Sequence, residues 1–269
     1  MLTDEECRSC VEGLLDAART GRPIGSLGQT FPGLTIADAY RIQRSWLEAL
    51  CAGGVRAVGY KVGLTSTATQ ALFGAAEPMY GRILAQGVLA SGSRIRAAAF
   101  PRPRIEVELA FILGADLAGA DVSRAQALEA TERIVPAFEI VAQRTDASRV
   151  LGDAIADNGA HGAVVLGSGG IAPGDVDVAA ISATLYRNRE PIESGAASSV
   201  MGHPAEAVAW LARTLARAGE RLERGQIILT GTLTPAIAIV PGNSYRAEYS
   251  GPGTGAGAGA LGALEVTFG

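Results

Sequence analysis

One eight-residue stretch decides how the middle of this chain folds, and it reads Arg104-Ile105-Glu106-Val107-Glu108-Leu109-Ala110-Phe111. Its β-branched and apolar residues predict a strand, in which alternate side chains share a face. Glu106 and Glu108 then lie on one face, about 7 Å apart along the backbone. Ile105, Val107 and Leu109 fill the other face, so we predict a strand that carries two carboxylates in strongly apolar surroundings.

Two carboxylates held together in an apolar setting repel each other and are poorly solvated. A hard divalent cation with oxygen ligands, Mg²⁺ or Mn²⁺, would relieve both penalties. A third carboxylate, Glu139, lies in a similar apolar segment at residues 136–141. The alternative is that Glu106 and Glu108 line an edge or a solvated strand face, because alternation by itself is also typical of such a face.

Two other segments contain residues suited to chemistry. Lys61 stands in an apolar, glycine-flanked strand, where a partly buried amine with a lowered pKa can act as a general acid or base. The alternative is a lysine whose ammonium reaches solvent. Asn158 lies in Asp157-Asn158-Gly159, which is first of all a turn signal, although its amide could also hydrogen-bond a substrate carboxylate. Serine-hydrolase, zinc-protease and dinucleotide-binding motifs are absent from the sequence.

The rest of the chain predicts helices at the start and a mainly β domain after them. Thr3 with Glu6 and Thr35 with Asp38 are capping patterns that open two helices. Two later helices are expected from Ser123 to about residue 133 and over residues 204–218. Short apolar runs punctuated by Gly and Pro predict strands at residues 57–62, 104–113, 136–142, 162–166, 181–186, 226–229, 236–240, 244–249 and 264–268.

Composition excludes several classes of function. The chain has 269 residues, 48% of them hydrophobic, and a net charge of −4 with no basic block, which argues against nucleic-acid and anionic-membrane partners. Three cysteines do not make a disulfide framework, and the Cys7–Cys10 pair stands alone on a predicted helix. The acidic N-terminus does not resemble a signal peptide, and the uncharged residues 225–245 are best interpreted as two buried strands. We therefore expect a cytoplasmic protein.

The segments that carry chemistry, taken together, resemble a known family. The chain is similar to the 2-keto-4-pentenoate hydratase / 4-oxalocrotonate decarboxylase family, within the fumarylacetoacetate hydrolase superfamily. The resemblance runs from about residue 23 to residue 249, and it is carried by residues 35–43, 59–66, 104–111, 136–140, 156–158, 202–212 and 225–231. So many segments in the same order make the assignment far stronger than any single motif.

The resemblance implies a fold, a metal site and a substrate. The implied fold is α+β: a mainly helical region over residues 1–85, then a domain of mixed, rolled β-sheets over residues 86–269. Glu106, Glu108 and Glu139 match the family's Mg²⁺ or Mn²⁺ ligands, and Lys61 matches its active-site lysine. The ion would chelate the carboxylate and 2-oxo oxygen of a small 2-oxo acid. We expect three further residues to bind substrate: Ser66, Asn158 and Thr230. Family members are typically homo-oligomers, and some hydratases and decarboxylases associate with each other.

Two residues depart from the family pattern and bear on specificity. Hydratases of the family usually carry Asp where Met79 stands, whereas decarboxylases tend to have an apolar residue there. His161 replaces a small residue, and the Gly/Ala-rich residues 251–262 look like a flexible insertion. We place a hydratase slightly ahead of a decarboxylase. A C–C hydrolase of the wider superfamily is disfavoured. The alternative that is not an enzyme is a non-catalytic partner subunit of such an enzyme.

Overall fold

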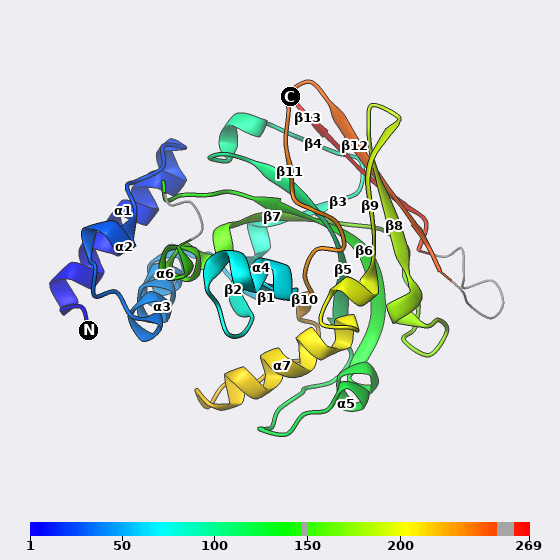
Figure 1. Cartoon of the computed structure of the whole chain (residues 1–269), viewed down its shortest axis with the longest axis horizontal. Coiled ribbons are helices and arrows are strands. Elements are labelled where there is room, and N and C mark those ends of the chain that lie inside the picture. The colour runs from blue at the N-terminus through cyan, green and yellow to red at the C-terminus, as the bar shows by residue number, and fades with distance from the viewer. Residues whose placement is uncertain (147–149, 252–260) are drawn as a thin grey trace.

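The computed structural model describes residues 1–146, 150–251 and 261–269, and it has helices packed beside and below two β-sheets (Figure 1). Most of the predicted Gly/Ala-rich insertion, at residues 252–260, lies outside the described residues. The mixed helix-and-sheet fold class expected from the sequence is confirmed.

The larger sheet has eight strands and carries most of the chemistry-bearing residues. From one edge to the other, its strands are β2 (Met79–Leu84), β1 (Ala57–Gly63), β10 (Ile227–Leu229), β5 (Arg104–Leu113), β6 (Thr131–Val141), β7 (His161–Leu166) and β3 (Val88–Ala90). The short β11 (Ile237–Ala238) also pairs with β5. The pairing is mixed, because β1 runs parallel to β10 and β5 runs antiparallel to both β10 and β6. The two longest strands, β5 and β6, lie side by side in the middle of the sheet.

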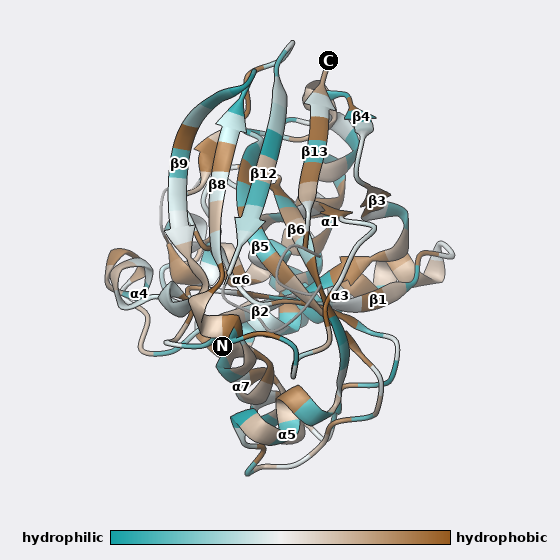
Figure 2. Ribbon diagram, turned by 90° about the vertical axis from the view of Figure 1, so that its right-hand side faces the viewer, coloured by the Kyte–Doolittle hydropathy of each residue, from teal (hydrophilic) through white to brown (hydrophobic). Residues whose placement is uncertain are grey.

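The smaller sheet has five strands in the order β4 (Ser93–Ile95), β13 (Ala263–Phe268), β12 (Ser244–Ser250), β8 (Ser182–Arg187) and β9 (Glu190–Ala196). Hydropathy alternates along its strands in Figure 2. On β12, for example, Tyr245 and Ala247 are buried while Arg246 is partly exposed. The apolar face of this sheet packs on the apolar face of the larger one, because Val107 and Phe111 of β5 share one buried cluster with Tyr245, Leu264 and Phe268.

The helices fall into two groups. The first group consists of α1 (Asp4–Thr20), α2 (Leu27–Thr30), α3 (Ile36–Ala52) and α6 (Leu151–Ala156), and it lies together on the left of Figure 1 with its own buried cluster. Both predicted caps form complete capping boxes, Thr3 with Glu6 and Thr35 with Asp38. The second group consists of α5 (Arg124–Glu129) and α7 (Pro204–Ala216), whose buried residues join the core between the sheets. The short α4 (Thr67–Phe73) follows β1.

Some sequence predictions differ from the structure. The strand at residues 104–113 matches β5, but the helix expected to reach residue 133 ends at Glu129, and β6 begins at Thr131. Pairing of Ile134 with Phe111 in the sheet outweighs local helical preference there. The strands β2, β3, β4 and β9 were not predicted. Helices dominate residues 1–85, yet β1 and β2 of this region are strands of the larger sheet, and the boundary at residue 85 stays a prediction. Among the described residues, no helix is long and apolar enough to cross a membrane.

Candidate metal centre and active site

The three predicted carboxylates meet on one face of the larger sheet. Glu106 on β5 pairs directly with Glu139 on β6, and Glu108 lies two residues farther along β5 on the same face. One carboxylate oxygen from each glutamate lies within 4.8 Å of the others. Glu108 and Glu139 are fully buried and Glu106 is half-buried, so these are not carboxylates of a solvated strand face. Within the described residues, this is the one group of three or more His, Cys, Asp or Glu side chains whose possible ligand atoms all lie this close together.

Crowding in a buried site shifts the pKa values of the three carboxyls apart. Burial and the neighbouring Glu139 raise the pKa of Glu106 to about 7. Burial, with the charges of Glu139 and Glu106, raises the pKa of Glu108 well above its usual range. Burial would also raise the pKa of Glu139, but the Lys61 ammonium and a hydrogen bond from His161 lower it overall. Without a cation, the site therefore resists full ionisation.

The cluster has the chemistry of a divalent-cation site. Glu108 Oε1 is buried and has no hydrogen-bond partner among the described residues, and Glu139 Oε2 has only its ion pair with Lys61. Buried carboxylate oxygens are costly unless they are paired or coordinate a metal. Three carboxylates at this separation offer the hard oxygen ligands that Mg²⁺, Mn²⁺ and Ca²⁺ prefer. Glu106, Glu108 and Glu139 therefore fit such an ion.

Lys61 on β1 lies next to the carboxylates. Its Nζ is 3.1 Å from Glu139 Oε2 and donates a hydrogen bond to the carbonyl of Gly159 at 3.1 Å. The side chain is only 5% exposed, which excludes a lysine that extends into solvent. The lowered pKa expected for this lysine beside a bound substrate stays a prediction, and in the metal-free chain the shift runs the other way. Burial would lower the pKa of Lys61, but the charges of Glu139, Glu106 and Glu108 raise it overall.

Asn158 holds the turn beside Lys61 in place. Its Oδ1 accepts from the backbone N–H of Arg82 at 2.7 Å, and its Nδ2 donates to the Arg82 carbonyl at 2.9 Å. Both polar atoms of the amide are thus used by the backbone of β2, which favours a positioning role over contact with a substrate carboxylate. The approach is close enough that a Cβ at Gly81 would lie 2.4 Å from the Asn158 carbonyl oxygen.

The segment after β10 supports Glu108. The backbone N–H of Gly231 donates to Glu108 Oε2 at 2.9 Å, and Gly231 has a φ of +113°. A Cβ there would lie 2.2 Å from Thr65 Oγ1, so only glycine fits. Thr230, which we expected to bind substrate, donates its hydroxyl to the Leu109 carbonyl at 3.1 Å. Ser66, also expected to bind substrate, caps α4 by accepting from the Thr69 backbone N–H.

Two supporting residues were missed in the sequence. Gly231 stands in the matched segment at residues 225–231, two residues after the end of a strand, where a glycine signals close backbone approach. Tyr249 belongs to β12 of the smaller sheet, and its hydroxyl lies 2.9 Å from the Glu108 carbonyl oxygen and 3.1 Å from that of Ala137. No local sequence signal marks Tyr249, because its partners lie more than 100 residues away.

The two residues expected to bear on specificity, Met79 and His161, lie beside this cluster. Met79 begins β2, pairs with Gly63 of β1 and is buried. A Cβ placed on Gly63 would lie 3.1 Å from Met79 Cε and 3.5 Å from Lys61 Nζ, so the ends of both side chains lie close to the same point. His161 begins β7, and its Nδ1 is 2.7 Å from Glu139 Oε1. The structure thus brings seven of the nine sequence-predicted site residues to one region, whereas Ser66 and Thr230 use their hydroxyls on the backbone nearby.

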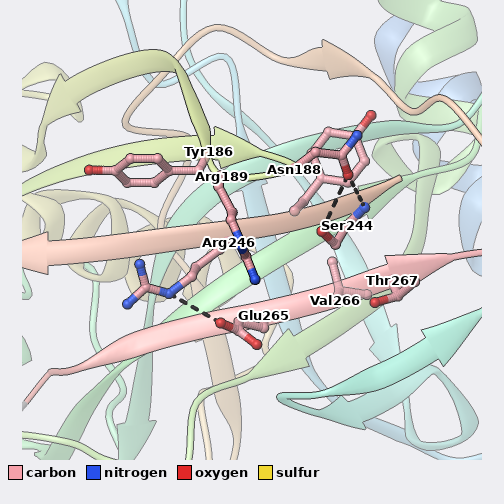
Figure 3. A pocket seen from close by; sticks show the side chains of 9 residues that line it. Tyr186, Asn188, Arg189, Ser244, Arg246, Glu265, Val266 and Thr267 are labelled. Carbon is pink, nitrogen blue, oxygen red and sulfur yellow. Dashed lines mark hydrogen bonds and ion pairs between the residues drawn. The ribbon is translucent and has the colours of Figure 1, made fainter. Parts of the chain in front are cut away.

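A hollow of about 320 Å³ lies elsewhere, on the smaller sheet (Figure 3). Arg246 in its wall pairs with Glu265 at 3.1 Å, and Asn188 accepts from the Ser244 backbone N–H. Some of its polar groups are therefore paired with one another, and none of the residues that line it belongs to the carboxylate cluster. We place the candidate site at the carboxylates, on chemical grounds, and not at this hollow.

Comparisons with known proteins show which family the chain is similar to. Residues 68–268 match the family model described as fumarylacetoacetate (FAA) hydrolase C-terminal. The chain is 35% identical over 254 residues to the 2-keto-4-pentenoate hydratase of Paraburkholderia xenovorans (strain LB400), covering 94% of each chain. It is 38% identical over 259 residues to the 2-oxo-hept-4-ene-1,7-dioate hydratase of Escherichia coli, covering 93% of this chain and 97% of that one.

A solved structure supports the same assignment. The 4-oxalocrotonate decarboxylase of Pseudomonas putida G7, complexed with magnesium and adipate, superposes with a TM-score of 0.93 and 29% identity. The superposition covers 100% of this chain and 99% of that one. The resemblance inferred from the sequence is confirmed. The chain therefore belongs to the fumarylacetoacetate hydrolase family, on the branch of the 2-keto-4-pentenoate hydratases and 4-oxalocrotonate decarboxylases.

Proposed function

We propose that this chain is a divalent-metal-dependent lyase for a small 2-oxo acid, and that it is a hydratase of the 2-keto-4-pentenoate type. The observation that carries the proposal is the buried cluster of Glu106, Glu108 and Glu139, with Lys61 Nζ 3.1 Å from Glu139. Relatives at 35% and 38% identity over nearly the whole chain are named as hydratases, which supports this branch.

The three glutamates would hold the ion, and we propose Mg²⁺ or Mn²⁺ because a related decarboxylase was solved with magnesium. When bound, the ion supplies Lewis-acid polarisation of the substrate's 2-oxo group and balances the negative charge that develops there. Glu108 is held for this task by the Gly231 N–H, and Glu139 is held by Lys61 and His161.

Lys61 is the candidate for moving a proton. Its ammonium contacts Glu139 Oε2 and the Gly159 carbonyl, so two acceptors fix the direction of Nζ. The neighbouring carboxylates favour the protonated amine in the metal-free chain, because they raise the pKa of Lys61. A bound dication would offset much of that negative charge and favour release of the proton. Lys61 is then suited to donate and recover a proton at the carbon next to the polarised 2-oxo group.

The second candidate is decarboxylation of a 4-oxalocrotonate-type substrate, and Met79 favours it. Its buried thioether borders Lys61 where family hydratases usually carry Asp. An apolar side chain supplies no acid or base for adding water, and it does not repel a departing carboxylate. Both reactions share the same electron sink, so this single position bears on which one follows.

Replacing this residue tests its part in the choice of reaction. If Met79 controls it, Met79→Asp should gain hydration relative to decarboxylation, measured as the ratio of the two products under identical conditions. Met79→Leu is the matched control, since it keeps an apolar side chain of similar volume. An unchanged product ratio in Met79→Asp would remove this residue from the argument.

Product analysis with Mg²⁺ present tests the function itself. The chain is offered 2-hydroxypenta-2,4-dienoate and 4-oxalocrotonate in separate reactions. A 4-hydroxy-2-oxo acid from the first substrate identifies a hydratase, and CO₂ from the second without hydration of the first identifies a decarboxylase. Failure to bind Mg²⁺ or Mn²⁺, seen as flat calorimetry and an unchanged melting temperature, would leave the non-catalytic partner subunit as the better proposal.

We also propose that the chain forms a homo-oligomer in the cytoplasm, in keeping with the family it belongs to. We further propose association with a hydratase or decarboxylase partner, and one experiment tests both expectations. Light scattering on the purified chain, alone and mixed with such a partner, gives the mass of each species directly. A monomer that stays monomeric at every concentration and in every mixture would contradict both expectations.

A further inference from the structure

An irregularity in β7 turns His161 towards the metal ligands. The strand pairs regularly with β6 at Glu139–Val164 and Ile140–Ala163, but Val141 then pairs with His161 and skips Gly162. An extra residue in one strand reverses which side chains face which side of the sheet. Without this bulge, His161 would point to the opposite face from Val164, whereas the observed ring reaches Glu139 on the carboxylate face.

The bulge depends on glycine and is held from behind. A Cβ at Gly162 would lie 2.8 Å from both the Ile140 carbonyl oxygen and Phe100 Cδ1, so no larger residue fits without a shift. Arg144 Nη2 donates to the His161 carbonyl at 2.8 Å, and its Nη1 pairs with the buried Asp157 at 3.0 Å. The backbone at His161 is therefore anchored independently of its side chain.

The contact between His161 and Glu139 has a definite polarity. Glu139 faces the Lys61 ammonium at 3.1 Å and is therefore an ionised carboxylate, which only accepts hydrogen bonds. Nδ1 of His161, 2.7 Å from Oε1, must then carry the hydrogen. The ring is buried and its Nε2 has no partner among the described residues, so the hydrogen bond of this side chain is the one from Nδ1 to Glu139.

We propose that His161 is a positioning residue that holds Glu139 Oε1 away from the ion, so that Glu139 binds as a one-oxygen ligand and the site prefers Mg²⁺ to Ca²⁺. This inference rests on the proposed metal-dependent function. Mg²⁺ requires near-ideal octahedral geometry at short distances, whereas Ca²⁺ accepts carboxylates that bind through one or two oxygens. A carboxylate fixed by hydrogen bonds therefore suits Mg²⁺, and a carboxylate that is free to rotate suits Ca²⁺.

The test compares Mg²⁺ and Ca²⁺ affinities of the chelator-stripped chain by titration calorimetry. His161→Leu removes the donor and keeps the volume, and it should weaken Mg²⁺ binding roughly 10–100-fold, the usual cost of losing a partner of a metal ligand. Ca²⁺ binding should change by less than about threefold, given its tolerance of ligand geometry. His161→Asn keeps an amide N–H near the position of Nδ1, and it should restore most of the Mg²⁺ affinity.

Val164→Ala provides the matched control for packing. Val164 is fully buried on the same strand, directly opposite Glu139, and has no polar side-chain atom. This variant should lower the melting temperature through its cavity but leave the Mg²⁺-to-Ca²⁺ affinity ratio unchanged. The ratio separates a positioning role from a merely structural one, because general loosening would weaken both ions together.

Three results would overturn the inference. The first is a Mg²⁺ affinity in His161→Leu within threefold of the original chain, and the second is an equal loss for both ions. The third is a directly bonded nitrogen in pulsed electron paramagnetic resonance of the Mn²⁺-loaded chain that disappears in His161→Leu, because His161 would then be a ligand. Absence of any ion binding by the original chain would instead overturn the proposed function, so the two failures are distinguishable.

Discussion

At the scale of single residues, the site is a set of like charges held close by its neighbours. Glu106 and Glu139 face each other across a strand pair, and Glu108 follows on the same face. Lys61 is the cation among them, paired with Glu139. One positive charge cannot balance three negative ones, which is why burial and mutual repulsion raise the pKa values of Glu106 and Glu108.

Glu106→Gln should separate binding of the ion from folding. The amide removes one ligand charge, so Mg²⁺-dependent kcat/KM should fall by more than the roughly 10–100-fold typical when only a partner of a metal ligand changes. The metal-free variant should melt at the same temperature as the original chain or higher, because one repulsive carboxylate is gone. Calorimetry and thermal melts, each with and without Mg²⁺, measure both effects. Retention of the original activity would contradict the assignment of Glu106 as a ligand.

At the scale of elements, the carboxylates depend on contacts from outside their own strands. Gly231 follows β10 and donates its N–H to Glu108, while Tyr249 extends from β12 of the other sheet to the carbonyl oxygens of Glu108 and Ala137. Those two carbonyls belong to paired residues of β5 and β6. Tyr249 therefore connects both carboxylate-bearing strands to the opposite layer of the core.

Tyr249→Phe should cost about 1–2 kcal/mol of unfolding free energy, because buried carbonyls lose a donor. For a chain of this length, each kcal/mol corresponds to roughly 2–4 °C in Tm. The variant should also weaken Mg²⁺ binding, because the backbone at Glu108 is held less firmly. Guanidinium denaturation and calorimetry measure the two quantities.

Tyr245→Phe is the matched control for this prediction. Tyr245 is a buried tyrosine on the same strand, and its hydroxyl accepts from the Val240 backbone N–H at 3.0 Å, away from the carboxylates. Loss of the Tyr245 hydroxyl should lower the free energy of unfolding by about as much as Tyr249→Phe does, and it should leave the Mg²⁺ affinity unchanged. Equal effects of the two variants on Mg²⁺ affinity would show that Tyr249 has no special link to the site.

At the scale of the whole molecule, metal binding and stability are linked through protons. The pKa of Glu106 is raised to about 7, so between about pH 4.5 and 7 the metal-free folded chain binds more protons here than the unfolded chain does. This contribution to stability is fully present below the usual carboxyl pKa and is lost as the pH rises through 7. The raised pKa of Glu108 acts in the same direction.

The metal-free chain should therefore lose stability between pH 5.5 and pH 8, and Mg²⁺ should offset the loss. Because the ion requires ionised carboxylates, the increase in Tm caused by Mg²⁺ should be larger at pH 8 than at pH 5.5. Thermal melts with chelator or with excess Mg²⁺ at the two pH values measure this. In Glu106→Gln the fall of the metal-free Tm should be shallower. A larger Mg²⁺ effect at the lower pH would contradict the linkage.

The amino-acid sequence alone determined the pieces of the site that depend on local pattern. Strand periodicity placed Glu106 and Glu108 on one face, and capping residues located the starts of α1 and α3. These signals are readable because each arises within a few residues of one element. The order of the matched segments identified the family for the same reason, since each motif is local.

Only the tertiary structure decided what those pieces do together. It brought Glu139 opposite Glu106, placed Lys61 against Glu139, and set the balance of burial and charge that raises the pKa of the lysine in the metal-free chain. It also assigned the side chain of Asn158 to the backbone of β2 and turned His161 towards Glu139 and the carboxylate cluster through the bulge at Gly162. Strand register, electrostatic balance and a one-residue bulge are set by contacts between distant segments, and such contacts leave no periodic trace in the sequence.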